Sequence, residues 1–366
     1  LVQKKKDYYE IMGKVLKPSE NRLGKRGGFI FSMESFCEKY KLPIWAAAAA
    51  VLLGLPLLGL SQYLIRIFIM IGIYSMLALG LNLLTGYTGQ VSLGHAGFFA
   101  IGAYVSSLMS INLGCSFIIS FIAGALITAL CGFLLGLPTM RLSGSYLTIV
   151  TLGFGEIVKM VLLNWTNVTN GPMGLKNIPK PNLFGMDLTL ANSGLYYLML
   201  LLVLLVSVVC VVLIRSKTGR AFIAIKDDEL AATMMGIRTS RFKILSFAFS
   251  AGIAGLAGAF YAPVISFIDP NTFVFDVSTL IISIVILGGM GTMRGMYLGA
   301  AILIAFPEVA RFLMDWRFVV YGLVLVVMMR FRPQGLLGWK SQMPYKLPKL
   351  TRIALEERKA QRAAEA

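Results

Sequence analysis

The chain has 366 residues, of which 57% are hydrophobic and only 14% are charged. Soluble domains carry about 25% charged residues, so this composition excludes an ordinary soluble protein and favours one that spans a membrane. The formal net charge of +17 would also fit a nucleic-acid-binding protein, so the distribution of charge along the chain has to decide between the two.

The first 43 residues are rich in Lys and Arg and contain neither an uninterrupted apolar region nor a cleavage signal. We therefore expect residues 1–43 to be a basic cytoplasmic extension and not a signal peptide. Because the chain begins with Leu1 and not with Met, either it is a fragment or its assigned start lies upstream of a natural one such as Met33.

Apolar runs of about 20 residues, each long enough to cross the hydrocarbon core of a bilayer, dominate residues 44–331. They predict an all-α, polytopic membrane protein with about ten spans, and at least eight. The third span is the weakest, because Gly94, Gly97 and Gly102 interrupt it, and a broken or re-entrant segment is the alternative there. The candidate spans are 44–61, 63–85, 91–111, 116–137, 145–163, 194–214, 244–266, 277–293, 296–314 and 317–331.

Most of the positive charge lies in three segments. Residues 1–43 hold ten of the 34 Lys and Arg residues, 215–243 hold seven and 330–366 hold nine. The 164–193 loop holds only two and the 267–276 loop holds none. By the positive-inside rule the three basic segments are cytoplasmic and the two poor loops face out. Ten spans with both termini in the cytoplasm reproduce this alternation, so the charge reports topology and not contact with nucleic acid.

The ten spans divide into residues 44–163 and 194–331, joined by the outer loop 164–193. Each half has an odd number of spans, so the second would be inverted relative to the first, as in transporters built from inverted repeats. The residues of the two halves are too dissimilar to support this 5+5 repeat. Residues 332–366 contain scattered charges and three prolines, which predicts a short, mostly flexible cytoplasmic tail.

Residues 80–104 are too polar and too rich in glycine for a plain lipid-facing helix. Four polar side chains there must face protein or water, because hydrocarbon cannot satisfy their hydrogen bonds. One interpretation is an irregular segment that lines a translocation path; the other is close helix packing, and both can hold together. The four residues are Asn82, Gln90, Ser92 and His95.

Glu156 interrupts the fifth span about 20 Å from its cytoplasmic end, at 1.5 Å per residue. A carboxylate at the centre of a membrane helix costs roughly 2.5–3.5 kcal/mol on insertion scales, so we expect a partner or a wet cavity. Lys159, three residues on, can reach it. A place on the translocation path and a structural ion pair are the two interpretations.

Residues 215–243 form a polar island between apolar runs. Three acids followed by a glycine predict one short capped helix over residues 227–236. Ile223, Leu230, Met234 and Ile237 follow at helical spacing and give it an apolar stripe. A docking surface for a soluble partner and a helix lying on lipid head groups both fit. The candidate surface comprises Asp227, Asp228, Glu229, Leu230, Ala231, Ala232, Met234, Gly236 and Ile237.

Further along the chain, Ala251, Gly255 and Ala259 form a small-xxx-small face suited to tight helix packing. His95 is the only histidine, and the four cysteines have neither metal nor redox spacing. The phosphate-binding pattern GxxxxGK[ST] is absent from the sequence. We therefore expect no metal site, no nucleotide site and no enzymatic activity on this chain.

Taken together, these segments resemble the inner-membrane permeases of bacterial high-affinity branched-chain amino acid uptake systems, which are ABC importers. The similarity is closest to the larger of the two permease subunits and covers roughly residues 63–340. The similar blocks are GLNLLTGYTGQVSLGHAGFFAIGAY (80–104), GSYLTIVTLGFGEIVK (144–159), NGPMGL (170–175), SKTGRAFIAIKDDELAATMMGIRTSRFK (216–243), GAFYAPVISFIDPNTF (258–273) and ILGGMGTMRGMYLGA (286–300).

In this family a cytoplasmic helix fits a groove on the ATPase subunit, and its acid, small residues and glycine are matched by Glu229, Ala231, Ala232 and Gly236. The chain has Glu-Leu-Ala-Ala where many importers have Glu-Ala-Ala. Residues 1–43 have no counterpart in the family.

The resemblance implies a bacterial inner-membrane complex with a second related permease, two ATPases that bind the ATP and Mg²⁺, and a solute-binding protein outside. No cofactor is then expected on this chain. Related permeases for urea, amides or nucleosides are the closest alternative. A stand-alone secondary carrier is a further alternative, and a single histidine without clustered nucleophiles argues against a membrane enzyme.

Overall fold

The computed structural model describes residues 61–309 except 141, 143, 184–185 and 189–192, together with the single positions 54, 56, 322, 326, 330 and 335–337. The expected extension 1–43, the first and tenth spans (44–61 and 317–331) and the tail 332–366 fall outside the described residues, apart from those single positions. All elements named here belong to the compact unit that begins at Ser61.

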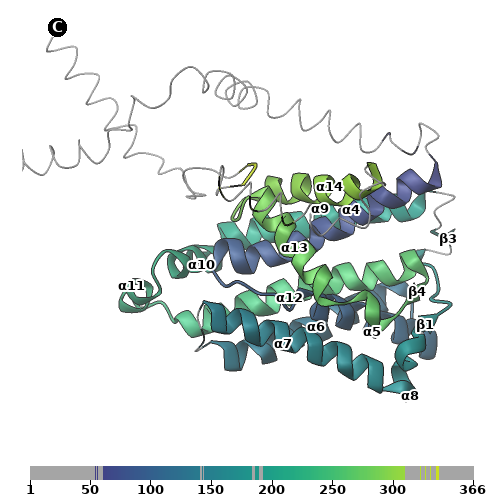
Figure 1. The fold of residues 1–366 in the computed structure, drawn as a ribbon, viewed down its shortest axis with the longest axis horizontal. Coiled ribbons are helices and arrows are strands. Elements are labelled where there is room, and N and C mark those ends of the chain that lie inside the picture. The colour runs from purple at the N-terminus through teal and green to yellow at the C-terminus, as the bar shows by residue number, and fades with distance from the viewer. Residues whose placement is uncertain are drawn as a thin grey trace, which may run out of the picture. The chain divides into compact units, whose positions relative to one another are not determined.

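Long helices make up most of the described part and run side by side (Figure 1). They are α4 (Gln62–Asn82), α5 (His95–Asn112), α6 (Phe117–Thr139), α7 (Ser145–Asn164), α9 (Gly194–Arg215), α12 (Thr239–Ile265), α13 (Phe275–Gly288) and α14 (Met293–Val309). A π-helical turn, η3 (Leu83–Tyr87), continues α4.

The connections contain shorter elements. The polar island holds α10 (Lys217–Asp227) and α11 (Glu229–Met234). The loops predicted to face out hold α8 (Thr166–Thr169), η4 (Gly171–Met173), η5 (Pro270–Thr272) and four two-residue strands. The strands are β1 (Leu175–Lys176), β2 (Asn182–Leu183), β3 (Met186–Asp187) and β4 (Phe267–Ile268).

Six of the described helices are long and apolar enough to cross a membrane: Gln62–Tyr87, Phe117–Thr139, Ser145–Asn164, Gly194–Arg215, Thr239–Ile265 and Pro270–Gly288. Their positions match the second, fourth, fifth, sixth, seventh and eighth predicted spans. Helices α5 and α14 match the third and ninth. The all-α, polytopic class is therefore confirmed, whereas the count of ten depends on residues outside this part of the chain.

Three predicted boundaries were wrong. The third span was expected from residue 91, but residues 88–94 are non-helical and α5 begins at His95. From there the helix is continuous to Asn112, so Gly97 and Gly102 do not interrupt it as expected. The eighth was expected to reach residue 293, but α13 ends at Gly288, because Gly289 and Gly291 turn the chain with φ of +105° and +84°. Helix α12 begins at Thr239, inside the predicted loop 215–243.

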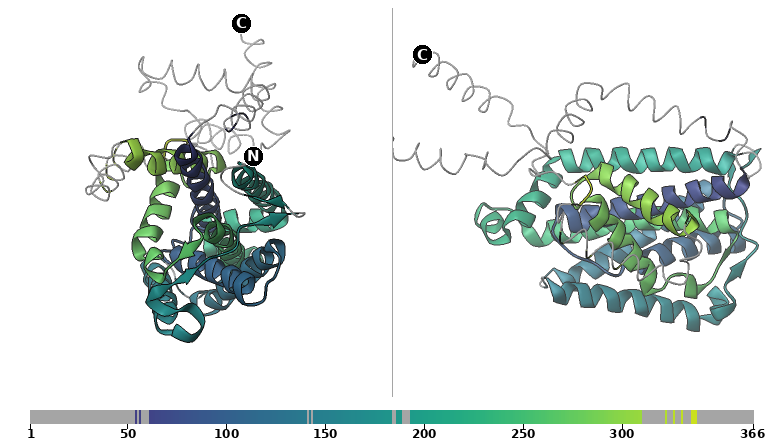
Figure 2. Two further views of the ribbon diagram at one scale, coloured as in Figure 1. Left: turned by 90° about the vertical axis from the view of Figure 1, so that its right-hand side faces the viewer. Right: turned by 45° about the horizontal axis from the view of Figure 1, so that its top comes forward.

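Helices α4 and α12 lie at the centre and pack against each other. Helix α12 also packs on α5 and α6. Helix α4, purple in Figure 2, also packs on α9 and on the yellow-green helices α13 and α14. The pairs α5–α6 and α13–α14 are neighbours too. Small residues permit the closest approach: a Cβ placed on Gly102 of α5 would lie 2.3 Å from the Gly255 carbonyl oxygen of α12. The predicted small-xxx-small face of α12 is thus a packing face.

The basic connection 215–243 and the loops predicted to face out lie at opposite ends of this unit. Helices α10 and α11 are at one end, and α8, β1 and β4 are at the other (Figure 1). At the latter end β1 pairs with β4 in antiparallel register, Leu175 opposite Ile268. The loops predicted to face out are therefore neighbours, as a common side of the membrane requires. The polar end holds the segment that the charge pattern predicted to be cytoplasmic.

Candidate functional site

The polar island folds into two capped helices, not the one predicted. The Ser216 hydroxyl accepts from the Gly219 amide (3.4 Å) at the start of α10, and Asp228 Oδ1 accepts from the Ala231 amide (3.0 Å) at the start of α11. The predicted single helix from Asp227 was therefore wrong: Asp227 ends α10. The reason is local. The Asp228 side chain accepts a hydrogen bond from the Ala231 amide, and the Asp228 backbone is extended, with φ −158° and ψ 110°, so the helix is interrupted there.

Gly236 closes α11 as predicted, with φ +83°. The Gly236 amide donates to the Thr233 carbonyl (3.0 Å) and the Ile237 amide donates to the Ala232 carbonyl (3.0 Å). These two hydrogen bonds form a Schellman motif, in which the glycine takes the left-handed position.

The outer surface of α11 is apolar and uncovered within the described unit. Leu230, Met234 and Met235 are 69%, 77% and 83% exposed, whereas Ala232 is buried against the rest of the unit. The prediction that Ile223 belongs to the same apolar stripe was wrong, because Ile223 lies in α10. Exposed leucine and methionine side chains on a short capped helix are suited to insertion into an apolar groove on another protein.

Two charged contacts hold α10 and α11 to the long helices. Lys226 Nζ donates to the Gly86 carbonyl at the end of η3 (2.6 Å), and Glu229 pairs with Lys243 in the first turns of α12 (2.5 Å). Burial lowers the pKa of the Lys226 ammonium, while the neighbouring Asp227 carboxylate acts in the opposite direction. Apolar packing adds to this attachment, because Phe222 of α10 is buried against Leu83 and Ile214.

Asn82 is buried and joins two distant turns. Its Oδ1 accepts from the Gly291 amide (2.8 Å), and its Nδ2 donates to the Thr292 carbonyl (3.3 Å). Both partners lie in the turn between α13 and α14. In this conformation Asn82 therefore holds the end of α4 to that turn.

Gln90 and His95 contact successive turns of α12. Ser246 Oγ donates to Gln90 Oε1 (3.0 Å), and His95 Nε2 lies 2.8 Å from Ser250 Oγ. Ser92 accepts from the Gly94 amide at 3.4 Å. Gln90 Nε2 and His95 Nδ1 are buried, and neither has a hydrogen-bond partner among the described residues. Such unpaired groups are costly inside a membrane protein unless water or a second conformation satisfies them.

Glu156 belongs to α7, which packs on the start of α5: a Cβ on Gly155 would lie 3.6 Å from the Cα of Gly94. Glu156 is partly exposed, in a shallow groove with Met160 and Asn164. Both Glu156 and Lys159 are in the described part of the chain, and no ion pair joins them there. The structure therefore brings Gln90 and His95 onto one face of α12, whereas Asn82 contacts the turn between α13 and α14. No hydrogen bond or ion pair among the described residues links Glu156 to these three residues.

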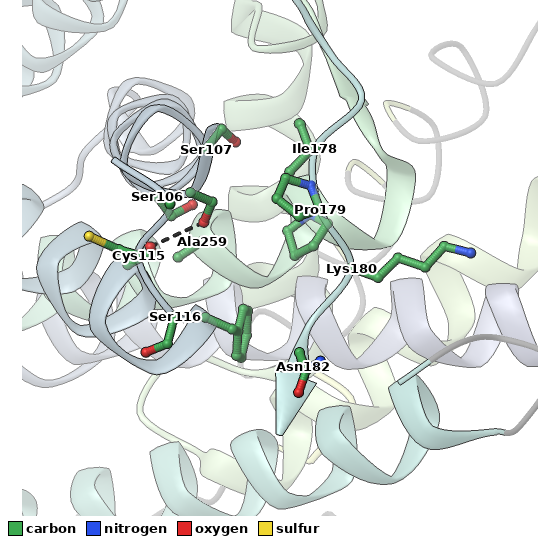
Figure 3. A pocket seen from close by; sticks show the side chains of 14 residues that line it. Ser106, Ser107, Cys115, Ser116, Ile178, Pro179, Lys180, Asn182 and Ala259 are labelled. Atoms are coloured by element: carbon green, nitrogen blue, oxygen red, sulfur yellow. Dashed lines mark hydrogen bonds between the residues drawn. The ribbon is translucent and has the colours of Figure 1, made fainter. Parts of the chain in front are cut away.

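A cavity of about 400 Å³ lies at the opposite end from α11 (Figure 3). Hydroxyls of α5 and α6 line one wall, where Ser110 donates to Ser120 (3.1 Å), and Ile178 and Pro179 of the outer loop line the other. The Lys180 side chain extends away from the space. Within residues 61–309 as described, no cluster of three His, Cys, Asp or Glu residues could hold a metal ion.

The sequence matches the family model described as branched-chain amino acid transport system / permease component over residues 63–329. The chain belongs to this family. It is 40% identical to the high-affinity branched-chain amino acid transport system permease protein LivM of Salmonella typhimurium, over 72% of this chain and 68% of the relative. LivM of Escherichia coli gives the same identity and coverage. The fructose import permease FrcC of Rhizobium meliloti is 27% identical over 66% of this chain and 69% of the relative. No solved structure matches the chain.

Sequence reasoning missed the serines that complete the polar contacts of this permease. Ser246 and Ser250 bind Gln90 and His95, and Ser278 of α13 accepts from the Ala96 amide at the start of α5 (2.9 Å). The spacing of Ser246 and Ser250, one helical turn apart in an apolar span, was the available signal. Nothing local to Ser278 indicates its partner, because the two residues are 182 positions apart.

Proposed function

We propose that this chain is the transmembrane permease subunit of an ABC importer that carries branched-chain amino acids across the bacterial inner membrane. The observation that supports this role best is α11, a short doubly capped helix with exposed Leu230, Met234 and Met235 at the polar end of the unit. The 40% identity to LivM supports the choice of solute. At 27%, the similarity to the fructose import permease supports the permease role but not fructose as the solute.

In this proposal the phosphate chemistry belongs to partner subunits. Two ATPases bind ATP and Mg²⁺, and each accepts a cytoplasmic helix of one permease in a groove; on this chain that helix is α11. A second related permease completes the membrane pore, and a solute-binding protein delivers the amino acid to the outer loops. Closure of the ATPases then displaces α11 and opens the path inward.

We further propose ten spans with both termini in the cytoplasm, built as an inverted repeat. Exchanging α4 with α12, α5 with α13 and α6 with α14 converts the packing of α12 on α4, α5 and α6 into the packing of α4 on α12, α13 and α14. Both central helices are also followed by a segment without α-helix, residues 88–94 after η3 and 266–274 after α12. This pairing pattern supports the repeat where residue similarity does not.

We also propose that the segment containing Asn82, Gln90, Ser92 and His95 forms part of the translocation path, with Glu156 contributing from α7. The unpaired Gln90 Nε2 and His95 Nδ1 support this, because they are buried polar groups that a second conformation can hydrate. A zwitterion crossing the membrane needs weak, distributed polar contacts, since a tight site would slow release.

The test of the transport function is uptake into proteoliposomes. The tagged chain is purified in mild detergent with whatever subunits accompany it, reconstituted, and supplied with the solute-binding protein and radiolabelled leucine. We expect uptake that requires ATP inside the vesicle. Uptake driven by a proton gradient alone would instead identify a secondary carrier, and ATP-dependent uptake of another solute would refute only the choice of solute.

The path is tested by Gln90→Leu and Glu156→Gln in the same vesicles. We expect each to reduce uptake several-fold, within the usual range for lost polar contacts, while the affinity of the solute-binding protein for leucine stays unchanged. Met160→Leu, one turn from Glu156 in the same groove, is the control. If both variants assemble and transport at the wild-type rate, these residues serve packing only.

A further inference from the structure

The α10–α11 pair contacts the irregular end of α4 directly. Lys226 Nζ donates to the Gly86 carbonyl (2.6 Å), and its side chain lies 3.3 Å from the position a Cβ on Gly89 would occupy. Gly86 and Gly89 flank the point where the helix ends and the non-helical segment 88–94 begins. Lys226 therefore joins the polar island to the place where the backbone of the second span changes conformation.

The Gly86 carbonyl needs such a donor. The last carbonyls of a helix have no partner within the helix, and the helix dipole places partial negative charge there. An ammonium group at this position makes a charge-assisted hydrogen bond, which is stronger than a neutral one. The π-helical form of residues 83–87 adds to this, since single π-turns inside helices are frequent at functional sites.

Gly86 is also pressed against the turn between α13 and α14. A Cβ on Gly86 would lie 2.5 Å from the Gly291 nitrogen and 2.0 Å from Asn82 Oδ1, the atom that accepts from the Gly291 amide. A displacement of Gly86 therefore affects both the connection from α4 to α5 and the turn between α13 and α14.

A second contact supports the same connection from α12. Glu229, the first residue of α11, pairs with the buried Lys243, and Ser246 one turn further on donates to Gln90 Oε1. The segment 86–90 is therefore held at one end by Lys226 of α10 and at the other by a helix that is paired with α11. A displacement of α10 and α11 cannot leave this segment unaffected.

We propose that Lys226 is a positioning residue that transmits movement of the α10–α11 pair to η3, at the inner end of α4, and to the non-helical segment 88–94. This rests on the proposed function, in which an ATPase moves α11. The Lys226–Gly86 hydrogen bond joins α10 directly to the end of η3, so a movement of one pulls on the other. Without it, the cytoplasmic helices can follow the ATPases while the non-helical segment 88–94 stays where it is.

The test compares Lys226→Met, Lys226→Arg and Lys217→Met in the reconstituted importer. Methionine keeps the length of the side chain but removes its donor, and arginine keeps both charge and donor. Lys217 is the exposed first residue of the same helix, so Lys217→Met is the matched control for loss of one positive charge. ATPase recovery, receptor-stimulated ATP hydrolysis and leucine uptake are measured for each.

For Lys226→Met we expect the leucine transported per ATP hydrolysed to fall about tenfold, within the range of coupling between sites. ATPase recovery and hydrolysis should stay near wild-type levels, and Lys226→Arg and Lys217→Met should remain coupled. Unchanged stoichiometry in Lys226→Met would overturn the proposal. So would a parallel loss of assembly, hydrolysis and uptake, which identifies a purely structural residue. If the wild-type complex shows no ATP-dependent uptake, the proposed function itself fails, and that result is separate from these.

Discussion

Gly236 determines how α11 ends, and therefore which side chains α11 presents. Its φ of +83° lies in the region that glycine adopts freely, and it ends the helix so that Met234 and Met235 point outward. A Cβ there would meet nothing within 4 Å. The requirement for glycine is conformational and not steric crowding.

Replacing Gly236 by Val should distort the end of α11, because a β-branched residue in the left-handed region costs roughly 1–2 kcal/mol or more. We expect Gly236→Val to insert into the membrane normally but to lose co-purification of the ATPases. Gly236→Asn is the matched control, since asparagine accepts this conformation. Normal ATPase recovery and normal uptake for Gly236→Val would exclude α11 as the essential contact.

At the scale of elements, glycines set the distance between α5 and the central helix α12. Gly102 of α5 touches the backbone of Gly255 of α12, whereas Gly153 of α7 has open space where a Cβ would lie. The two residues have the same chemistry and the same secondary structure. Only their surroundings differ. Comparing the change in stability when each is replaced by alanine therefore isolates the contribution of packing.

Gly102→Ala should therefore destabilise the protein by about 1–3 kcal/mol, the usual cost of overpacking. Gly153→Ala should be neutral or stabilise the protein by roughly 0.5–1 kcal/mol, because alanine loses less backbone freedom on forming a helix. Thermal unfolding in detergent is followed by a thiol-reactive dye in a background where Cys37, Cys115 and Cys131 are replaced by alanine. The remaining Cys210 is 99% buried and becomes reactive on unfolding. Equal midpoints for the two variants would contradict the packing assignment.

At the scale of the whole molecule, the loops sort by charge to opposite ends of the helices. The basic island 215–243 lies at one end, and the poorly charged loops 164–193 and 266–274 pair through β1 and β4 at the other. The charge pattern assigns the basic island to one side of the membrane and the two poorly charged loops to the other. In the structure the two loops lie together, at the end opposite the island.

Impermeant maleimide labelling of single cysteines in intact cells tests the sidedness. Met173 and Ser240 are the sites to use, because both are exposed, one at each end, and Ser240 lies outside the α11 surface assigned to the ATPase. In a chain whose four native cysteines are replaced by alanine, Met173→Cys should label strongly and Ser240→Cys only after permeabilisation. Equal labelling of both in intact cells would overturn the assigned topology.

Much of this permease could be predicted from the sequence, because the relevant physics is local. The length of an apolar run decides whether a helix can span a bilayer, and charge in the adjoining loop orients it. The cap of α11 by Asp228 and its end at Gly236 follow from residues within one turn of each other. Where two local signals competed, at Asp227 and Asp228, the prediction began the helix one residue before its cap, and it did not anticipate α10.

The tertiary structure alone decided which polar groups meet. Lys226 and Gly86 are 140 positions apart, Gln90 and Ser246 are 156 apart, and Asn82 and Gly291 are 209 apart. A buried donor needs an acceptor at about 3 Å, but no local pattern says which distant helix supplies it. The sequence by itself determined that Asn82, Gln90 and His95 must avoid lipid. The packing of α4 and α12 against their neighbours determined that each faces protein, and which residue it contacts.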